Sequence, residues 1–110
     1  MTFVTLEEAK LYLRADYDDD DALIGSLLDY AGRLCRDVAR LSDKEWEDID
    51  SDKAWSDTYT KAEMQDIRER LRIAVLYAVA YLYEHREEAD HNALNLTLRA
   101  LLFSSHEGGF

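Results

Sequence analysis

The sequence is almost free of the residues that break helices or form tight turns. Its 110 residues include no proline and only four glycines, two of which, Gly108 and Gly109, lie in the last three positions. Folds built from many short strands need frequent turns, and turns rely on glycine and proline. We therefore predict an all-α fold in one domain over residues 1–110. It should be a small bundle of about four helices, with one long central helix and a long acidic loop.

Two capping boxes mark the starts of helices. Thr5 and Thr60 are each followed three residues later by a glutamate, so the hydroxyl and the carboxylate can satisfy free amides of the first turn. They predict a short helix over residues 6–13 and the longest helix from about 60 to 88. Between them, a one-sided apolar stripe from Leu23 to Val38 predicts a helix that begins among Asp18–Asp21 and ends near residue 41.

A last helix is predicted over residues 93–103, after a polar break at 90–92. Its apolar residues fall on two faces: Leu94, Leu98, Leu101 and Leu102 on one, and Leu96, Ala100 and Phe103 on the other. One small core cannot easily cover both faces. Residues 104–110 carry no pattern that would hold local structure, and we predict a flexible tail there.

Residues 42–59 show no steady periodicity and are strongly acidic. We predict a long loop, with at most one helical turn over residues 45–49. Long loops in compact domains are uncommon and are often functional. Two interpretations stay open: a solvated loop anchored to the body by its tryptophans, or a contact loop that becomes ordered on assembly. The residues that would carry either role are Trp46, Asp48, Asp50, Asp52 and Trp55.

The long helix is apolar on both sides in its middle. Its core stripe includes Leu71, Val75 and Leu82, while the opposite face begins with charged residues and then turns apolar. Such a segment needs cover on two sides. Another helix of the same chain could supply it, but a neighbouring subunit is favoured because exposed apolar patches mark interaction sites. The predicted subunit interface is Ile73, Leu76, Tyr77, Ala80 and Tyr81.

The charge and the termini limit the functional classes. Against 13 lysines and arginines stand 24 aspartates and glutamates, a formal net charge of −11. An acidic surface repels phosphate backbones and disfavours ordinary nucleic-acid binding. The first residues lack a basic region and an apolar signal core. The longest apolar run, residues 73–83, is too short to span a bilayer as a helix. We expect a soluble intracellular protein without a membrane partner.

Metal sites and catalytic motifs are not supported. Asp16, Asp18 and Asp20 match positions 1, 3 and 5 of an EF-hand loop, but Asp21 replaces the required glycine and Leu27 the bidentate glutamate. Capping of the following helix is the better explanation of these carboxylates.

The remaining reactive side chains lead to the same conclusion. His85 and His91 lie six residues apart across a predicted helix end and form no zinc motif. Cys35 lies within an apolar stripe, which is typical of a buried structural thiol. The sequence contains neither a glycine-rich phosphate loop nor a nucleophile elbow. We therefore predict no catalytic, cofactor-binding or metal-binding residue and no enzymatic activity.

Both ends of the helical region carry a family resemblance. The run Val4-Thr5-Leu6-Glu7-Glu8-Ala9-Lys10-Leu11-Tyr12-Leu13-Arg14, followed by Asp16 and Asp18-Asp19-Asp20-Asp21-Ala22-Leu23-Ile24, resembles the opening of the phage head–tail connector family. These proteins are also labelled possible DNA-packaging proteins. Val79-Ala80-Tyr81-Leu82-Tyr83-Glu84-His85-Arg86-Glu87 resembles the close of that family's long helix. The resemblance spans residues 4–103, and residues 42–59 depart from it.

The resemblance implies a structural virion protein without a cofactor. It implies a homo-oligomeric ring of about twelve subunits at the head–tail junction, between the portal protein and a tail-side head-completion or tail-terminator protein. DNA would pass through the ring without specific binding. The protein would assemble in the host cytoplasm or be encoded by a prophage. A portal-docking tail with Phe103, His106 and Phe110 is expected to become ordered only in the particle.

Two alternatives remain open. The first is a small acidic helical regulator that binds a basic partner protein, its surface imitating nucleic acid. This alternative explains the charge but not the apolar back of the long helix. The second is a small enzyme of unrecognised type, which would need a pocket with converging polar groups.

Overall fold

The structure is a computed structural model, and it describes residues 3–14, 20–51, 56, 59–85 and 92–103. Within these residues the chain forms five helices and no strand: α1 (Leu6–Leu13), α2 (Asp21–Ala39), α3 (Asp43–Asp50), α4 (Lys61–Glu84) and α5 (Asn92–Phe103). The predicted all-α bundle with one long helix is therefore confirmed. The number of helices is five rather than about four, because the segment predicted as a loop contains α3.

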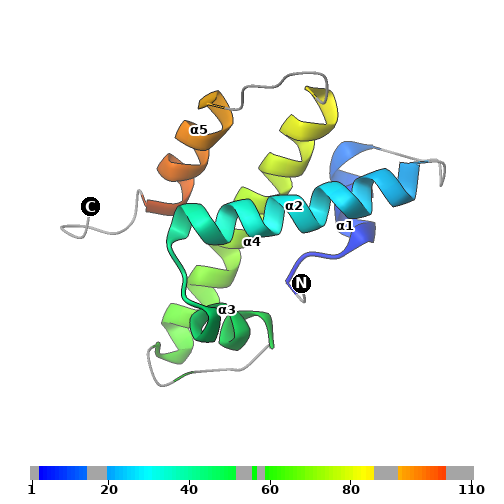
Figure 1. The fold of residues 1–110 in the computed structure, drawn as a ribbon. Coiled ribbons are helices and arrows are strands. Elements are labelled where there is room, and N and C mark those ends of the chain that lie inside the picture. Colours follow the sequence, from blue (N-terminus) through cyan, green and yellow to red (C-terminus); the bar gives the residue numbers. More distant parts are fainter. Residues whose placement is uncertain (1–2, 15–19, 52–55, 57–58, 86–91, 104–110) are drawn as a thin grey trace.

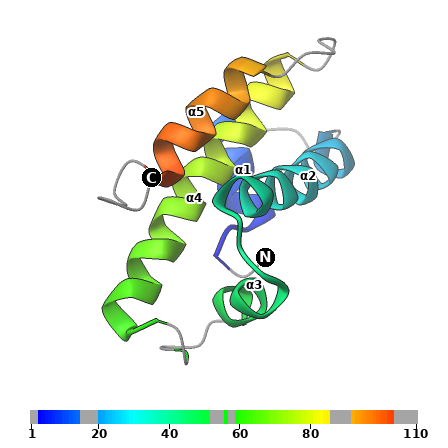
Figure 2. The same cartoon turned by 60° about the vertical axis from the view of Figure 1, so that its left-hand side comes forward.

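Helix α4 is the centre of the bundle, and the other four helices all contact it. Helix α2 crosses α4, while α5 lies beside the C-terminal half of α4, and both views agree on this arrangement (Figures 1 and 2). Helix α1 packs against α2 and α4, and α3 lies near the N-terminal half of α4. The chain thus surrounds its longest helix with its shorter ones.

The capping residues explain where the helices begin. The Thr60 hydroxyl accepts a hydrogen bond from the Glu63 amide at 3.2 Å, and the Glu63 carboxylate accepts one from the Thr60 amide at 2.9 Å. At α1 only half of the box forms: the Thr5 hydroxyl accepts from the Glu8 amide at 3.1 Å. The Glu8 carboxylate instead pairs with Arg72 of α4, which ties α1 to the central helix.

Helix α3 corrects the prediction of a long acidic loop over residues 42–59. Ser42 and Glu45 form a third capping box, with both reciprocal hydrogen bonds present at 3.0 and 3.1 Å. Eight residues become helical where one turn was expected, because the box satisfies the first amides and Ile49 enters the core with no exposed surface. The connection between α3 and α4 is therefore shorter than the loop predicted over residues 42–59.

The ends of the other helices lie close to the predicted ones. Helix α2 ends at Ala39, and α5 begins at Asn92, each within two residues of expectation. Helix α4 ends at Glu84, where the His85 amide donates to the Tyr81 carbonyl at 2.9 Å, four residues before the predicted end. Helices α1 and α2 are followed by the C-cap residues Arg14 and Arg40, each in the left-handed conformation with φ of 57°.

One continuous core joins all five helices. Its fully buried side chains include Val4, Ile24, Ile49, Met64, Leu71, Val75, Val79, Leu94 and Leu98. Helix α4 contributes residues from more than one face, among them Ala74, Leu76 and Val79. Much of the second cover that its apolar middle requires therefore comes from the same chain.

Candidate assembly surfaces

The predicted subunit interface on α4 divides into exposed and buried parts. Ile73 is 48% exposed, whereas Leu76 is only 9% exposed and belongs to the core. Tyr77, Ala80 and Tyr81 are half-buried, and the two tyrosines pack against the core. Ile73 is thus the side chain of this set that projects most into solvent. The assignment of the five residues to a subunit contact stays a prediction.

The C-terminal end of α4 is held by a ring stack. Tyr81 and His85 stack with centroids 4.2 Å apart and planes 18° from parallel. The His85 Nδ1 atom lies 2.9 Å from the Tyr81 carbonyl oxygen. In the same turn of the helix, Tyr83 donates to the Asp20 carboxylate at 2.5 Å, which fixes the start of α2 against α4. These contacts are structural, and they leave the histidine engaged within its own chain.

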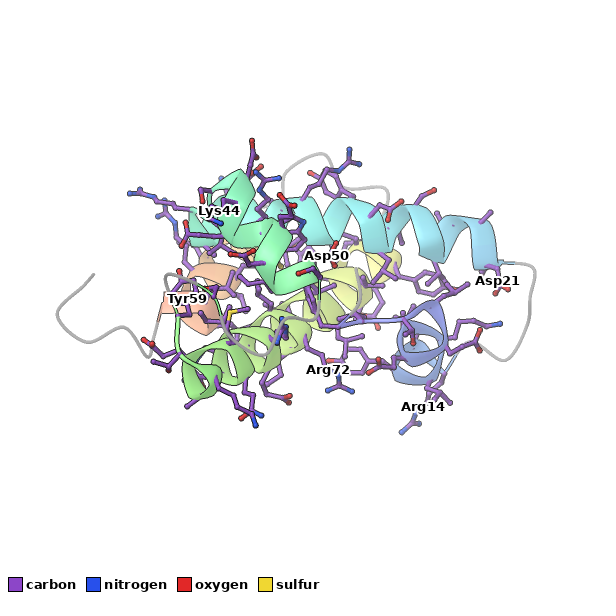
Figure 3. The ribbon with its side chains drawn as sticks, turned by 90° about the horizontal axis from the view of Figure 1, so that it is seen from below. Arg14, Asp21, Lys44, Asp50, Tyr59 and Arg72 are labelled. Atoms are coloured by element: carbon purple, nitrogen blue, oxygen red, sulfur yellow. The ribbon has the colours of Figure 1, made fainter. Side chains whose placement is uncertain are left out.

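The acidic segment is docked on the body of the protein. Trp46 is half-buried and meets Phe3 edge-on, with ring centroids 5.7 Å apart. Asp48 is only 5% exposed, and its carboxylate lies 3.9 Å from the Lys44 ammonium. Asp50 is half-buried at the end of α3 (Figure 3). Asp52 and Trp55 lie outside the described residues. Trp46 thus packs against the N-terminal segment, and the role of these residues in anchoring or in assembly stays a prediction.

Arg68 of α4 fastens α3 at its C-terminal end. Its Nε atom donates to the Ile49 carbonyl at 2.9 Å, and its Nη2 atom donates to the Asp48 carbonyl at 3.2 Å. These are carbonyls of the last turn of α3, where the helix dipole places negative charge and favours a cation. The predicted tryptophan anchor is thus joined by an arginine clamp that the sequence pattern did not indicate.

A tyrosine–glutamate contact closes the same region. The Tyr59 hydroxyl donates to the Glu45 carboxylate across the segment that follows α3. This hydrogen bond, and then the Ser42 amide, hold the pKa of Glu45 below its ordinary value. Burial, and then the neighbouring Glu45, raise the pKa of Tyr59 to about 12. The pair stabilises the local fold with the carboxylate ionised and the phenol protonated.

Large apolar side chains are exposed on three other helices of the described chain, and on α2 this side chain is Tyr30, which is 45% exposed. On α1, Leu11 is 80% and Tyr12 is 50% exposed, and on α5, Leu96 is 65% exposed. The two-faced pattern of α5 had indicated that Leu96 would lack cover. The α1 pair was missed, although its signal was present, because Leu11 and Tyr12 lie off the inward side formed by Leu6, Ala9 and Leu13.

Leu96 borders a groove between α2 and α5. The groove has a volume of about 850 Å³ and is lined by Leu34, Asp37, Val38, Arg40, Asn92, Asn95, Leu96 and Arg99. The groove lies at the C-terminal half of α2. Helix α1 packs near the start of α2, at the other end of that helix (Figure 1). The groove combines apolar walls with a mixed charged rim, which suits a protein segment better than a small polar substrate.

The other residues singled out in the sequence include one thiol and the C-terminal group. Cys35 is fully buried in α2, and burial raises the pKa of its thiol to about 12. Phe103 is the last residue of α5, and His106 and Phe110 lie outside the described residues. Across the described ranges, no group of three or more histidine, cysteine, aspartate or glutamate side chains is placed to hold a metal ion.

The helices are also unlike membrane spans. None of the helices in the described part of the chain has both the length and the apolar character that crossing a bilayer requires.

Comparison with known proteins supplies the family. No curated protein and no solved structure matches the chain. The model of a protein family described as phage gp6-like head–tail connector protein matches residues 3–104. This match includes all five helices and the region of the sequence resemblance. Because it covers nearly the whole sequence, the chain belongs to the phage gp6-like head–tail connector family.

Proposed function

We propose that this chain is the subunit of a ring that joins the portal to the tail-side proteins and continues the DNA channel. The observation that carries the proposal is the family match over residues 3–104. Membership of that family gives the chain a structural role in the virion, at the head–tail junction. The ring, its size of about twelve subunits, and its contacts with portal and tail-side proteins are the parts that we propose.

The distribution of exposed apolar side chains supports assembly through unlike surfaces. Leu11 and Tyr12 lie on α1, Ile73 on α4 and Leu96 on α5, so the chain has apolar surface on several sides. A contact between two different patches repeats from subunit to subunit and closes into a ring when the rotation is suitable. Each large apolar side chain buried in this way would contribute roughly 1.5–3 kcal/mol.

The net charge of −11 supports a channel role. An acidic wall repels the phosphates of DNA, so DNA can slide past it without adhesion. A basic channel wall in the assembled ring would contradict this part of the proposal.

The first test is the mass of the purified protein over a range of concentrations, by native mass spectrometry and light scattering. A closed species of about twelve subunits supports the ring. A monomer at every concentration moves the test to purified portal protein, which should then recruit the chain. Failure of both steps would contradict the proposal and favour the acidic regulator of a basic partner.

A variant sharpens this test on α4. We expect Tyr77→Glu to give a folded helical monomer that no longer assembles, because a charge placed in a subunit contact loses its hydration without gaining a partner. Glu84→Gln, on an exposed position of the same helix, is the control and should assemble normally. Rings of normal size from Tyr77→Glu would remove α4 from the interface.

A further inference from the structure

We propose that the groove between α2 and α5 receives the outer face of α1 from a second copy of this chain. The inference rests on the proposed ring and names the surfaces that would join its subunits. It differs from the predicted contact on α4, because neither surface includes the α4 residues. The groove is occupied head to tail, so that each subunit offers its own groove on one side and its own α1 on the other.

The two surfaces match in apolar character. Leu34 and Val38 of α2 form part of the groove and pack against the core from their inner sides, and Leu96 of α5 stands 65% exposed beside them. On α1, Leu11 is 80% exposed and Tyr12 is 50% exposed. Both surfaces thus present large aliphatic or aromatic groups to solvent, and each could remove the other's apolar surface from water.

The groove also contains an unsatisfied polar atom. The Asn95 Oδ1 atom is buried and accepts no hydrogen bond from the described part of the chain. Asn95 lines the groove, and a buried acceptor without a donor is unfavourable. The exposed Tyr12 of α1 has a phenol hydroxyl that can donate to this oxygen once the Asn95 side chain rotates to face the groove.

Both surfaces carry charges of both signs, so Glu7 can face the arginines of the groove while Arg14 faces Asp37. The groove is bordered by Arg40 and Arg99, which are exposed and form no ion pair within the described ranges, and by one carboxylate, Asp37. This border is locally basic on a chain with a net charge of −11. On the outer face of α1, the exposed Glu7 precedes Leu11 by one helical turn and the exposed Arg14 follows it by three residues, so Leu11 is flanked by one carboxylate and one guanidinium. Opposite charges across such a contact fix its register.

The positions of the two surfaces require a second copy. Lys10 of α1 pairs with Asp21 at the start of α2, at 2.9 Å, whereas the groove uses Leu34 to Arg40 near its end. At 1.5 Å per residue, Asp21 and Val38 lie roughly 25 Å apart along the helix. Figures 1 and 3 both place α1 and α5 at opposite ends of α2. One subunit therefore cannot fill its own groove with its own α1, so α1 must come from another copy, and a contact that continues head to tail is heterologous.

Disulfide trapping tests the contact directly. Leu11→Cys and Leu96→Cys are introduced together, and the protein is mildly oxidised at the concentrations used for the mass measurement. The native Cys35 does not compete, because it is fully buried and its thiol pKa is raised to about 12. We expect a ladder of linked dimers, trimers and larger species. Mixing the two single variants should give mainly dimers that contain one of each.

The matched control pairs Leu11→Cys with Tyr30→Cys. Tyr30 is 45% exposed on α2 but does not line the groove. Equal cross-linking of the control and the groove pair, or no ladder from the groove pair, would overturn the proposed contact.

A charge exchange provides a second, independent readout. Arg99→Glu should weaken self-association about tenfold or more, and Glu7→Arg in the same chain should restore a substantial part of it. Restoration supports the pairing of Glu7 with Arg99, and its absence together with a negative cross-link overturns the contact. The mass of the wild-type protein distinguishes failure of the groove contact from failure of the ring. Rings without the Leu11–Leu96 link overturn the groove contact alone, whereas the absence of any assembly, with and without portal, overturns the ring as well.

Discussion

Helices α4 and α5 have the same kind of sequence and different surroundings. Each carries apolar residues on two faces, but α4 lies at the centre and α5 at the edge of the bundle (Figure 2). On α4, Leu76 from the second face is only 9% exposed. On α5, Leu98 is fully buried while Leu96 is 65% exposed. An apolar pattern therefore shows that a face needs cover, and position in the fold decides whether the chain itself supplies it.

The largest effect is expected from comparing the two faces of α5. Leu98→Ala should lower the free energy of unfolding by about 2–5 kcal/mol, because it opens a cavity in the core. Leu96→Ala should change it by less than about 0.5 kcal/mol, because the side chain is mostly in water. Urea denaturation at low protein concentration measures both values. Similar losses from the two variants would mean that α5 is covered on both faces.

The same comparison on α4 gives a smaller difference. Leu76→Ala should cost about 2–3 kcal/mol of unfolding free energy, because Leu76 belongs to the core. Ile73→Ala should cost about 1 kcal/mol or less, because Ile73 is 48% exposed. If Ile73 contacts a neighbouring subunit, Ile73→Ala should weaken ring assembly more than Leu76→Ala does. A small stability loss from Leu76→Ala would indicate that this residue faces another subunit.

The arginine clamp extends the comparison to the other half of α4. Arg68→Ala removes the donors to the Asp48 and Ile49 carbonyls and should cost about 1–3 kcal/mol. Hydrogen exchange should show the amides of α3 opening more often while those of α5 stay protected. Arg70→Ala is the control, because Arg70 forms an exposed pair with Asp66 worth only about 0.3–0.5 kcal/mol. Equal exchange in the two variants would argue against the clamp.

The smallest effect concerns pH and the contact between Tyr59 and Glu45. The pKa of Glu45 is lowered in the folded chain, so its contribution to stability is present above its unfolded value, near about 4.3, and is lost as the pH falls through the folded value. The pKa of Tyr59 is raised to about 12, so its contribution is present below about pH 10 and is lost as the pH rises toward 12.

Tyr59→Phe should therefore lower stability by up to about 1 kcal/mol at neutral pH, since both groups are partly solvated. Thermal unfolding from acid to alkaline pH should show the two proteins converging at both extremes. A difference independent of pH would mean that packing of the ring, rather than the hydrogen bond, accounts for the loss.

Local signals predicted most of the elements. The capping boxes at Thr5 and Thr60 marked the starts of α1 and α4, and the stripe from Leu23 to Val38 located α2. Helix α3 was predicted as at most one turn, although Ser42 and Glu45 carry the same box. The reason is that α3 is short and inserts chiefly Ile49 into the core, so its apolar periodicity is too weak to stand out among acidic residues.

The candidate surfaces were predicted less completely. The exposure of Ile73 and of Leu96 followed from two-faced helices, but Leu76 on one of those faces proved to be buried. The groove could not be foreseen, because Leu34, Val38 and Leu96 come from helices far apart in the sequence and meet only in the fold. The orphaned Asn95 oxygen is likewise a property of the packed structure.

By itself the sequence determined an all-α chain, the starts of its main helices, its acidic surface and its resemblance to head–tail connectors. Hydrogen bonds at helix ends and apolar periodicity depend on residues within about four positions of one another, so they can be identified in the linear chain. The tertiary structure decided which apolar faces are covered, which arginine holds α3, and where a groove opens between α2 and α5. Those outcomes depend on side chains that are distant in sequence and come into contact only when the helices pack together around α4.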